Sequence, residues 1–208
     1  MRQNYTVKFR RKLSGKTNYH IRLKLLSSGL PRLVIRKSLH NLVVQIVLFE
    51  ENGDKVVSSA HTRELIKLGW KASRDNLPAA YLCGLLAGKK ALAKNISKCI
   101  ADIGMQASTS GSRIYAALKG ALDAGLSIPV APDILPSYER VSGRDIESWA
   151  LKLKQQSVER YKRVFSQYLR NGLEPERISE HFEQLKAKII QNVELKQVGK
   201  ETNIATGG

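Results

Sequence analysis

Three short β-branched runs between residues 31 and 61 constrain the fold of this chain more than any other feature. The segments "RLVIRK", "NLVVQIVLFE" and "KVVSSAH" are rich in Val and Ile and are bounded by turn residues, which is typical of strands. Asn52-Gly53 lies between the second run and the third, and this dipeptide favours the tight turn of a β-hairpin. We therefore predict an antiparallel meander of three strands.

Helical spacing replaces the strand pattern after residue 75. "NLPAAYLCGLLAGKKALAKNI" has an apolar face at helical intervals, and its small residues Ala80, Gly84 and Gly88 predict a close approach of this helix to the sheet. "KCIADIG" reads as a short buried strand, and "RIYAALKGALDAGL" as a second helix that stops at Gly125. The predicted fold class is α/β: a β-β-β-α-β-α sandwich in which helices pack on a mixed sheet.

Five segments follow from the pattern along the chain. Residues 1–30 are predicted to be an extended basic N-terminal arm with one or two helical turns, and residues 31–128 an α/β globular domain. A Pro-rich surface segment (129–150), a C-terminal helical hairpin extension (151–196) and a disordered tail (197–208) complete the chain. The hairpin either packs on itself or docks on a partner protein or RNA, and the sequence leaves both open.

Positive charge is concentrated at the N-terminal end. Eleven of the 35 Lys and Arg residues precede Glu50, which is the first acid, and the whole chain carries a net charge of +17. Such a region suits a targeting peptide, a disordered tail, a membrane-surface segment or an arm that binds a polyanion. Because the charge continues into the first predicted strand, a removable peptide is disfavoured. No apolar run approaches the length of a membrane span.

Signs of catalysis are few. The sequence contains no phosphate-binding GxxxxGK[ST] loop, GxSxG or HExxH motif, and its four histidines are scattered. Asp102 ends a predicted strand, where nucleases keep a metal-binding carboxylate, but a metal site needs several converging carboxylates. We predict a non-enzyme without cofactor, metal or small-molecule substrate; a nucleic-acid enzyme or a DNA-packaging protein is the alternative. Cys83 and Cys99 are predicted to be buried, reduced thiols, which favours an intracellular location.

RNA binding has more support from the residues. The arm interleaves Phe9 and Tyr19 with cations, and cations contact phosphates while aromatic rings stack on bases. The first strand adds three cations, which suggests that one face or end of the sheet meets phosphate. "STSGSR" opens a predicted helix and suits an anion-binding corner as well as an ordinary N-cap at Ser110 or Ser112, and the two interpretations are compatible.

Three of these segments resemble a known family. "FRRKLSGKTNYHIRLKLLSSGLPRLVIRKS", "NLPAAYLCGLLAGKKA" and "TSGSRIYAALKGALDAGLSIP" are similar to the archaeal and eukaryotic type of ribosomal protein L-eighteen, over roughly residues 5–150. The resemblance implies a structural protein of the cytoplasmic ribosome that binds 5S rRNA, attaches it to the large-subunit rRNA in the central protuberance and neighbours ribosomal protein L-five. The present sequence departs from the family pattern at Leu13, Ser14 and Leu39.

The arm and the sheet edge carry the RNA contacts in that family. Together with Lys12 from the basic run, the matching positions predict these RNA-binding residues: Arg10, Arg11, Lys12, Lys16, Thr17, Tyr19, Arg22, Lys24, Arg32, Arg36, Lys37, Ser112 and Arg113.

Overall fold

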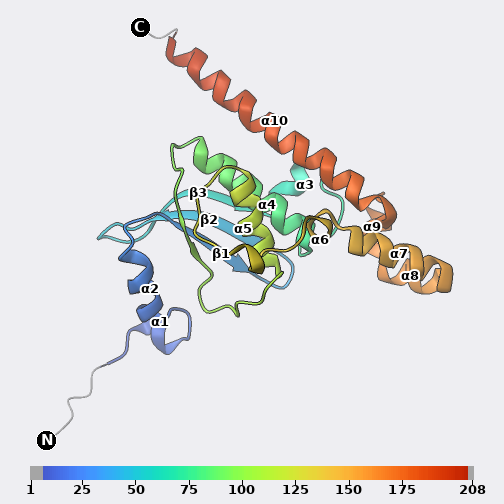
Figure 1. Cartoon of the computed structure of the whole chain (residues 1–208), viewed down its shortest axis with the longest axis horizontal. Coiled ribbons are helices and arrows are strands. Elements are labelled where there is room, and N and C mark those ends of the chain that lie inside the picture. Colours follow the sequence, from blue (N-terminus) through green and yellow to red (C-terminus); the bar gives the residue numbers. More distant parts are fainter. Residues whose placement is uncertain (1–6, 206–208) are drawn as a thin grey trace, which may run out of the picture.

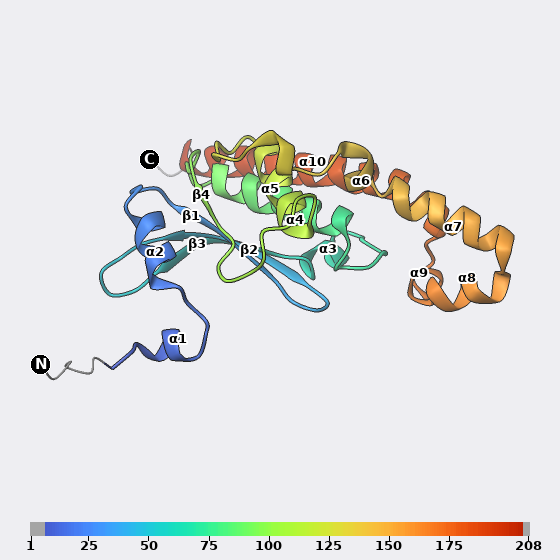
Figure 2. The ribbon, with the colours of Figure 1, turned by 60° about the horizontal axis from the view of Figure 1, so that its bottom comes forward.

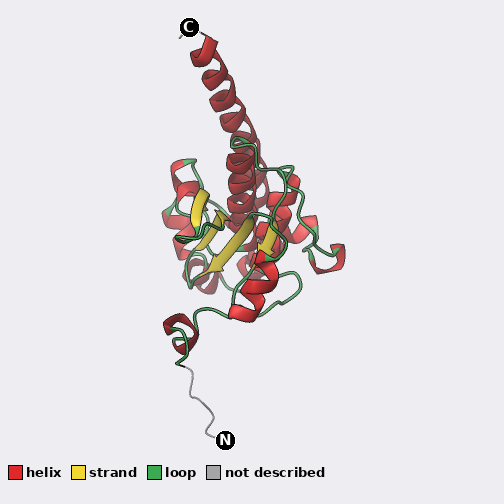
Figure 3. Cartoon of the chain, turned by 90° about the vertical axis from the view of Figure 1, so that its left-hand side faces the viewer, coloured by secondary structure: helices red, strands yellow, loops and turns green. Residues whose placement is uncertain are grey.

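The computed structural model describes residues 7–205, with side chains described for residues 7–191. A four-stranded sheet forms its centre, and the strands are β1 (Arg32–Lys37), β2 (Leu42–Leu48), β3 (Lys55–His61) and β4 (Ile100–Asp102). Their order is β3-β2-β1-β4; β1 to β3 are antiparallel, whereas β4 runs parallel to β1. Figure 3 views these strands from the side of the N-terminal arm. The predicted meander and mixed sheet are confirmed.

Two helices, α4 (Leu77–Leu92) and α5 (Arg113–Asp123), cover one face of the sheet (Figures 1 and 2). They approach each other closely: a Cβ on Gly84 would lie 1.9 Å from the Ala117 carbonyl oxygen, and one on Gly120 would lie 2.1 Å from the Tyr81 carbonyl oxygen. The predicted contact of the small-residue stripe with the sheet is therefore wrong, because the bare positions meet the neighbouring helix. Gly125 ends α5 with a φ of +109°, as predicted.

The core is apolar and continuous. Residues of β1 and β2 that face the helices are buried, as are both cysteines, which are free. Burial raises the pKa of the Cys99 thiol to about 11. Between β3 and α4, the short helix α3 (Glu64–Lys67) was not predicted. No helix in the described part of the chain is long and apolar enough to cross a bilayer.

Residues 129–150, which were predicted to be a Pro-rich surface segment, are largely helical. A 3-10 turn, η1 (Pro132–Ile134), leads into α6 (Tyr138–Ser142) and then α7 (Arg144–Gln156). Val141 and Ala150 are fully buried in the core, so the segment contributes to packing. Gly143 lies between α6 and α7 with a φ of +92°, a conformation that glycine adopts without strain.

The C-terminal region also differs from a simple hairpin. One predicted helix is divided at Phe165 into α8 (Val158–Val164) and α9 (Ser166–Arg170); η2 (Pro175–Arg177) then precedes the long α10 (Ile178–Ala205). Helix α10 packs on the body, with the Phe182 ring 5.5 Å from that of Tyr81. Helix α10 continues through residues 197–205, which were predicted to belong to a disordered tail, and residues 206–208 lie outside the described residues.

The N-terminal arm lies on the opposite side of the sheet from α4 and α5 (Figure 2). It contains two short helices, α1 (Arg10–Leu13) and α2 (Tyr19–Leu26), in agreement with the one or two helical turns predicted. Neither helix buries a residue fully. The arm therefore leaves most of its side chains available to a partner.

Candidate nucleic-acid interface

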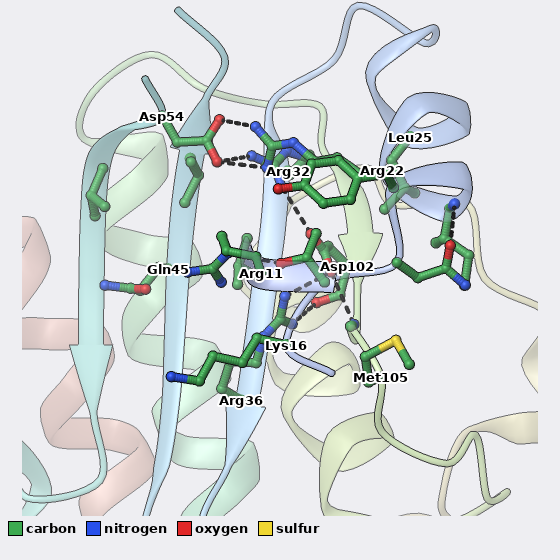
Figure 4. Close-up of a pocket in the computed structure, with 18 residues that line it drawn as sticks. Arg11, Lys16, Arg22, Leu25, Arg32, Arg36, Gln45, Asp54, Asp102 and Met105 are labelled. Atoms are coloured by element: carbon green, nitrogen blue, oxygen red, sulfur yellow. Dashed lines mark hydrogen bonds and ion pairs between the residues drawn. The ribbon is translucent and has the colours of Figure 1, made fainter. Parts of the chain in front are cut away.

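The face of the sheet that α4 and α5 leave uncovered forms the floor of a groove. Strand alternation directs Arg32, Val34 and Arg36 of β1 to this face, and the β1–β2 register sets Val47 and Gln45 beside the first two. Helix α2 and the α1–α2 turn form the opposite wall, as Figure 4 shows. The groove encloses about 560 Å³. It is large enough for a nucleotide-sized group.

A chain of alternating arginines and aspartates crosses this groove (Figure 4). Arg22 donates two hydrogen bonds of 2.8 Å to Asp54, whose Oδ2 also lies 2.6 Å from Arg32 Nη2. Asp102 then accepts from Arg32 Nη1 and from Arg36 Nη2, each at 2.9 Å. We call these five residues the arginine–aspartate chain. It ties α2 of the arm to the β2–β3 hairpin turn and to β4.

Asp54 is held as a carboxylate by this arrangement. The hydrogen bonds from Arg22 lower the pKa of Asp54 to about 2, and the nearby Arg32 guanidinium acts in the same direction, while partial burial opposes them. Because this ion pair is bidentate, it fixes orientation as well as charge. Helix α2 of the arm is therefore attached to the body at one defined point.

Arg32 does not behave as predicted for a phosphate contact. Its residue is 3% exposed, and its guanidinium lies between Asp54 and Asp102. Arg36 keeps 44% of its side chain exposed and lies flat over Gly104, where a Cβ would come within 2.8 Å of the guanidinium carbon. Arg32 is thus buried within its ion pairs, whereas part of the Arg36 side chain stays exposed.

Asp102 is fully engaged by the same contacts. One carboxylate oxygen accepts from Arg32, and the other accepts from Arg36 and from the backbone N–H of Gly104 at 2.9 Å. No group of three or more potential metal ligands occurs among the described residues. Oxygens that already accept from two guanidinium groups are poor ligands for a divalent cation. The contacts of Asp102 therefore disfavour the metal-binding role that the nuclease alternative gives it.

The remaining arm cations are exposed and have no acidic partner. Arg10, Arg11, Lys12, Lys16 and Lys24 form no ion pair with any acid among residues 7–191, and neither does Lys37 on β1. Uncompensated cations on an exposed surface attract polyanions. Acids among the described residues thus pair with four of the ten predicted cations, Arg22, Arg32, Arg36 and Arg113, and leave the other six without an acidic partner.

Local contacts give the arm its shape. Arg11 Nε donates to Thr17 Oγ1 at 2.8 Å, which closes the turn after α1. The Asn18 side chain caps α2 by accepting from the backbone N–H groups of His20 and Ile21. The rings of Phe9 and Tyr19 lie 5.0 Å apart, and Tyr19 also lines the groove. The predicted cations and aromatic residues therefore belong to a structured arm.

The second predicted anion site does not join this groove. Arg113 donates to the Asp75 carbonyl oxygen at 2.8 Å and lies near its carboxylate. Ser112 occupies the N-cap position of α5, but its side chain accepts no capping hydrogen bond, and Ser110 instead donates to the Asp133 carbonyl at 3.4 Å. Ser112 is therefore the N-cap residue by position, as one of the two alternatives predicted, but its hydroxyl makes no capping hydrogen bond.

Seven of the predicted residues meet in the groove, and six lie outside it. The former are Arg11, Lys16, Thr17, Tyr19, Arg22, Arg32 and Arg36; the latter are Arg10, Lys12, Lys24, Lys37, Ser112 and Arg113. Sequence reasoning missed Asp54, which orders the arm, and Gln45 on the groove floor. A signal for Asp54 existed, because it follows the Asn52-Gly53 turn and is one of the few acids near the cationic region.

Comparison with known protein families gives a direct result. Residues 3–98 and 93–131 match the model of the family described as "Ribosomal large subunit proteins 60S L5, and 50S L18". The chain belongs to this family. The matched region spans more than half of the chain and includes the arm, the sheet and α4 and α5. This member of the family is therefore a structural constituent of the large ribosomal subunit, while α6 to α10 lie beyond the matched residues.

Proposed function

We propose that this ribosomal protein binds 5S rRNA through its arm and the open face of its sheet. It attaches that RNA to the large-subunit rRNA in the central protuberance of the cytoplasmic ribosome, beside ribosomal protein L-five. Family membership supports the ribosomal role. The observation that carries the RNA assignment is that Arg11 and Lys16 line the groove without an acidic partner, whereas the other cations of the groove are paired.

The unpaired cations suit contacts with phosphate groups, and the groove suits the base and sugar of a nucleotide. Arg11 and Lys16 line the groove beside the half-buried Tyr19, so charge and an aromatic ring lie together. Valine side chains and Gln45 on the floor offer an apolar surface with one amide. Single-stranded or splayed RNA is recognised by this combination of backbone charge and base stacking.

Salt dependence tests the proposal. If five arm cations contact phosphate, the logarithm of 5S rRNA affinity falls with the logarithm of salt concentration at a slope of about −4. The variant Arg10→Ala/Arg11→Ala/Lys12→Ala should flatten the slope by about 2 to 3 and weaken binding roughly tenfold or more at physiological salt. Helix α1 buries no residue, so this variant should stay folded.

A matched control separates contact from net charge. The variant Arg63→Ala/Lys67→Ala/Lys98→Ala removes three exposed cations of the α/β body that pair with no acid among the side chains described. It changes the net charge equally and should leave the slope nearly unchanged. Equal losses in both variants would remove the arm from the mechanism. Equal affinity for duplex DNA and 5S rRNA at one salt concentration would instead favour a DNA-packaging protein.

A further inference from the structure

Helices α8 and α9 carry a row of arginines that the predicted interface does not include. Arg160 and Arg163 lie one turn apart on α8, and Gln167 and Arg170 lie one turn apart on α9, beyond the break at Phe165. All four are exposed. The buried aromatic residues of the same segment, Tyr161, Phe165 and Tyr168, occupy the opposite side. We call the three arginines the arginine ridge.

The ridge is not neutralised by its surroundings. Between residues 148 and 173 the chain has six Lys or Arg residues and one acid, Glu159. Nearby acids are engaged elsewhere, since Lys154 pairs with Glu176 at 2.9 Å and Arg177 pairs with Glu174 at 3.3 Å. None of the three ridge arginines forms an ion pair with an acid whose side chain the structure describes.

The scaffold under the ridge is well anchored. The Tyr161 hydroxyl donates to Glu176, with oxygen distances of 2.9 and 3.1 Å, and Asn171 Nδ2 donates to the Lys71 carbonyl at 2.7 Å. Phe165 packs against both tyrosines, with ring centroids 5.4 and 5.6 Å apart. The arginines therefore project from helices whose inner face is fixed to the body, which lowers the entropic cost of binding a partner.

The chemistry of the ridge favours a phosphate backbone. Arginine presents a planar set of donors that matches phosphate, and ten helical residues span about 15 Å, enough to follow several phosphates of one strand. A protein partner would instead need an apolar centre. Charged and polar side chains predominate on the exposed surface of α8 and α9, where Glu159 and the apolar Val158, Val164 and Leu169 are also exposed.

We propose that the arginine ridge binds the phosphate backbone of an RNA segment distinct from the one that the arm grips. Figures 1 and 2 both place α8 and α9 at the opposite end of the molecule from α1. The inference rests on the proposed RNA-binding function and extends it to residues beyond 131, where the family match ends. The protein would then hold two RNA segments, one at each end.

Footprinting of the full chain on RNA tests this. Hydroxyl-radical protection is measured on 5S rRNA and, separately, on large-subunit rRNA transcripts, with the wild type, Arg160→Ala/Arg163→Ala/Arg170→Ala and the arm triple variant. The ridge variant should lose protection at a set of nucleotides that the arm variant retains. The slope of log affinity against log salt for that RNA should become less steep by about 2.

Two further variants make the result specific. Arg160→Lys/Arg163→Lys/Arg170→Lys keeps the charge and should retain most of the salt slope. The Arg63, Lys67 and Lys98 control should keep both protections. Unchanged protections in the ridge variant would overturn the inference whether or not the arm binds 5S rRNA. Loss at the same nucleotides in the ridge and arm variants would also overturn it, as would loss of a protein partner with RNA binding intact.

Discussion

The two faces of the sheet use the same strands for different purposes. On the covered face, Leu33 and Ile35 of β1 are completely buried beneath α4 and α5. On the open face, Arg32 and Arg36 alternate with them and join the arginine–aspartate chain. The covered face determines the fold, whereas the open face determines which cations remain free. A cluster of cations in the sequence is therefore not equivalent to a cluster of RNA contacts.

The largest expected loss of stability comes from a substitution in the helices on the covered face. A Cβ at Gly84 would lie 1.9 Å from the Ala117 carbonyl oxygen, so Gly84→Ala forces α4 and α5 apart. We expect it to lower the free energy of unfolding by more than about 4 kcal/mol, measured by urea unfolding. Gly29→Ala is the control, because its Cβ has open space and costs only the strain of a φ of +66°, about 1–2 kcal/mol. A stable Gly84→Ala protein would show that the two helices are less tightly packed than described.

The fold was largely predictable because its strands and central helices follow local rules. The predicted runs "RLVIRK" and "KVVSSAH" coincide with β1 and β3, since alternation and the hairpin turn both act over a few residues. The segment around α6 and α7 was not predictable in this way, because prolines and Gly143 interrupt its helical pattern. Its burial depends on α10 and α4, which lie far away in the sequence.

The site was less predictable than the fold. The basic run identified the arm, but pairing decides which cations are free, and pairing is not local. Arg22 and Asp54 are 32 residues apart, and Arg32 and Asp102 are 70 apart. From the sequence, Arg32 and Lys37 look alike, although one is buried between two aspartates and the other is exposed.

The second largest effect should come from Asp102 on the open face. Asp102→Ala leaves the buried Arg32 with Asp54 alone and frees Arg36. Breaking a buried ion pair by removing one partner is strongly destabilising, and we expect a loss of about 3 kcal/mol in the free energy of unfolding. Glu50→Ala removes the exposed pair with Lys55 and should cost less than about 1 kcal/mol. Equal effects would mean that the arginine–aspartate chain contributes no more than a surface ion pair.

An effect on RNA binding without one on folding is expected at Tyr19. Tyr19→Ala removes a half-buried ring that lines the groove beside Phe9, and we expect a loss of about 1–3 kcal/mol in 5S rRNA binding. Thermal unfolding should be nearly unchanged, and Tyr19→Phe should retain most of the affinity because it keeps the ring. A Tyr19→Ala protein that loses stability instead would assign the ring to packing within the arm.

The smallest expected effect is the dependence of stability on pH that comes from Asp54. The pKa of Asp54 is about 2 in the folded protein and near 3.8 in the unfolded chain, so the folded state binds the proton less readily. The contribution of Asp54 is therefore complete above about pH 4 and is lost as the pH falls toward 2. Since this carboxylate is partly exposed, we expect about 1 kcal/mol after allowance for solvent screening. The stability difference between the wild type and Asp54→Asn, measured by urea unfolding at several pH values, should shrink across that range. A difference that stays constant from pH 6 to pH 2 would show that α2 is not held to the open face by this carboxylate.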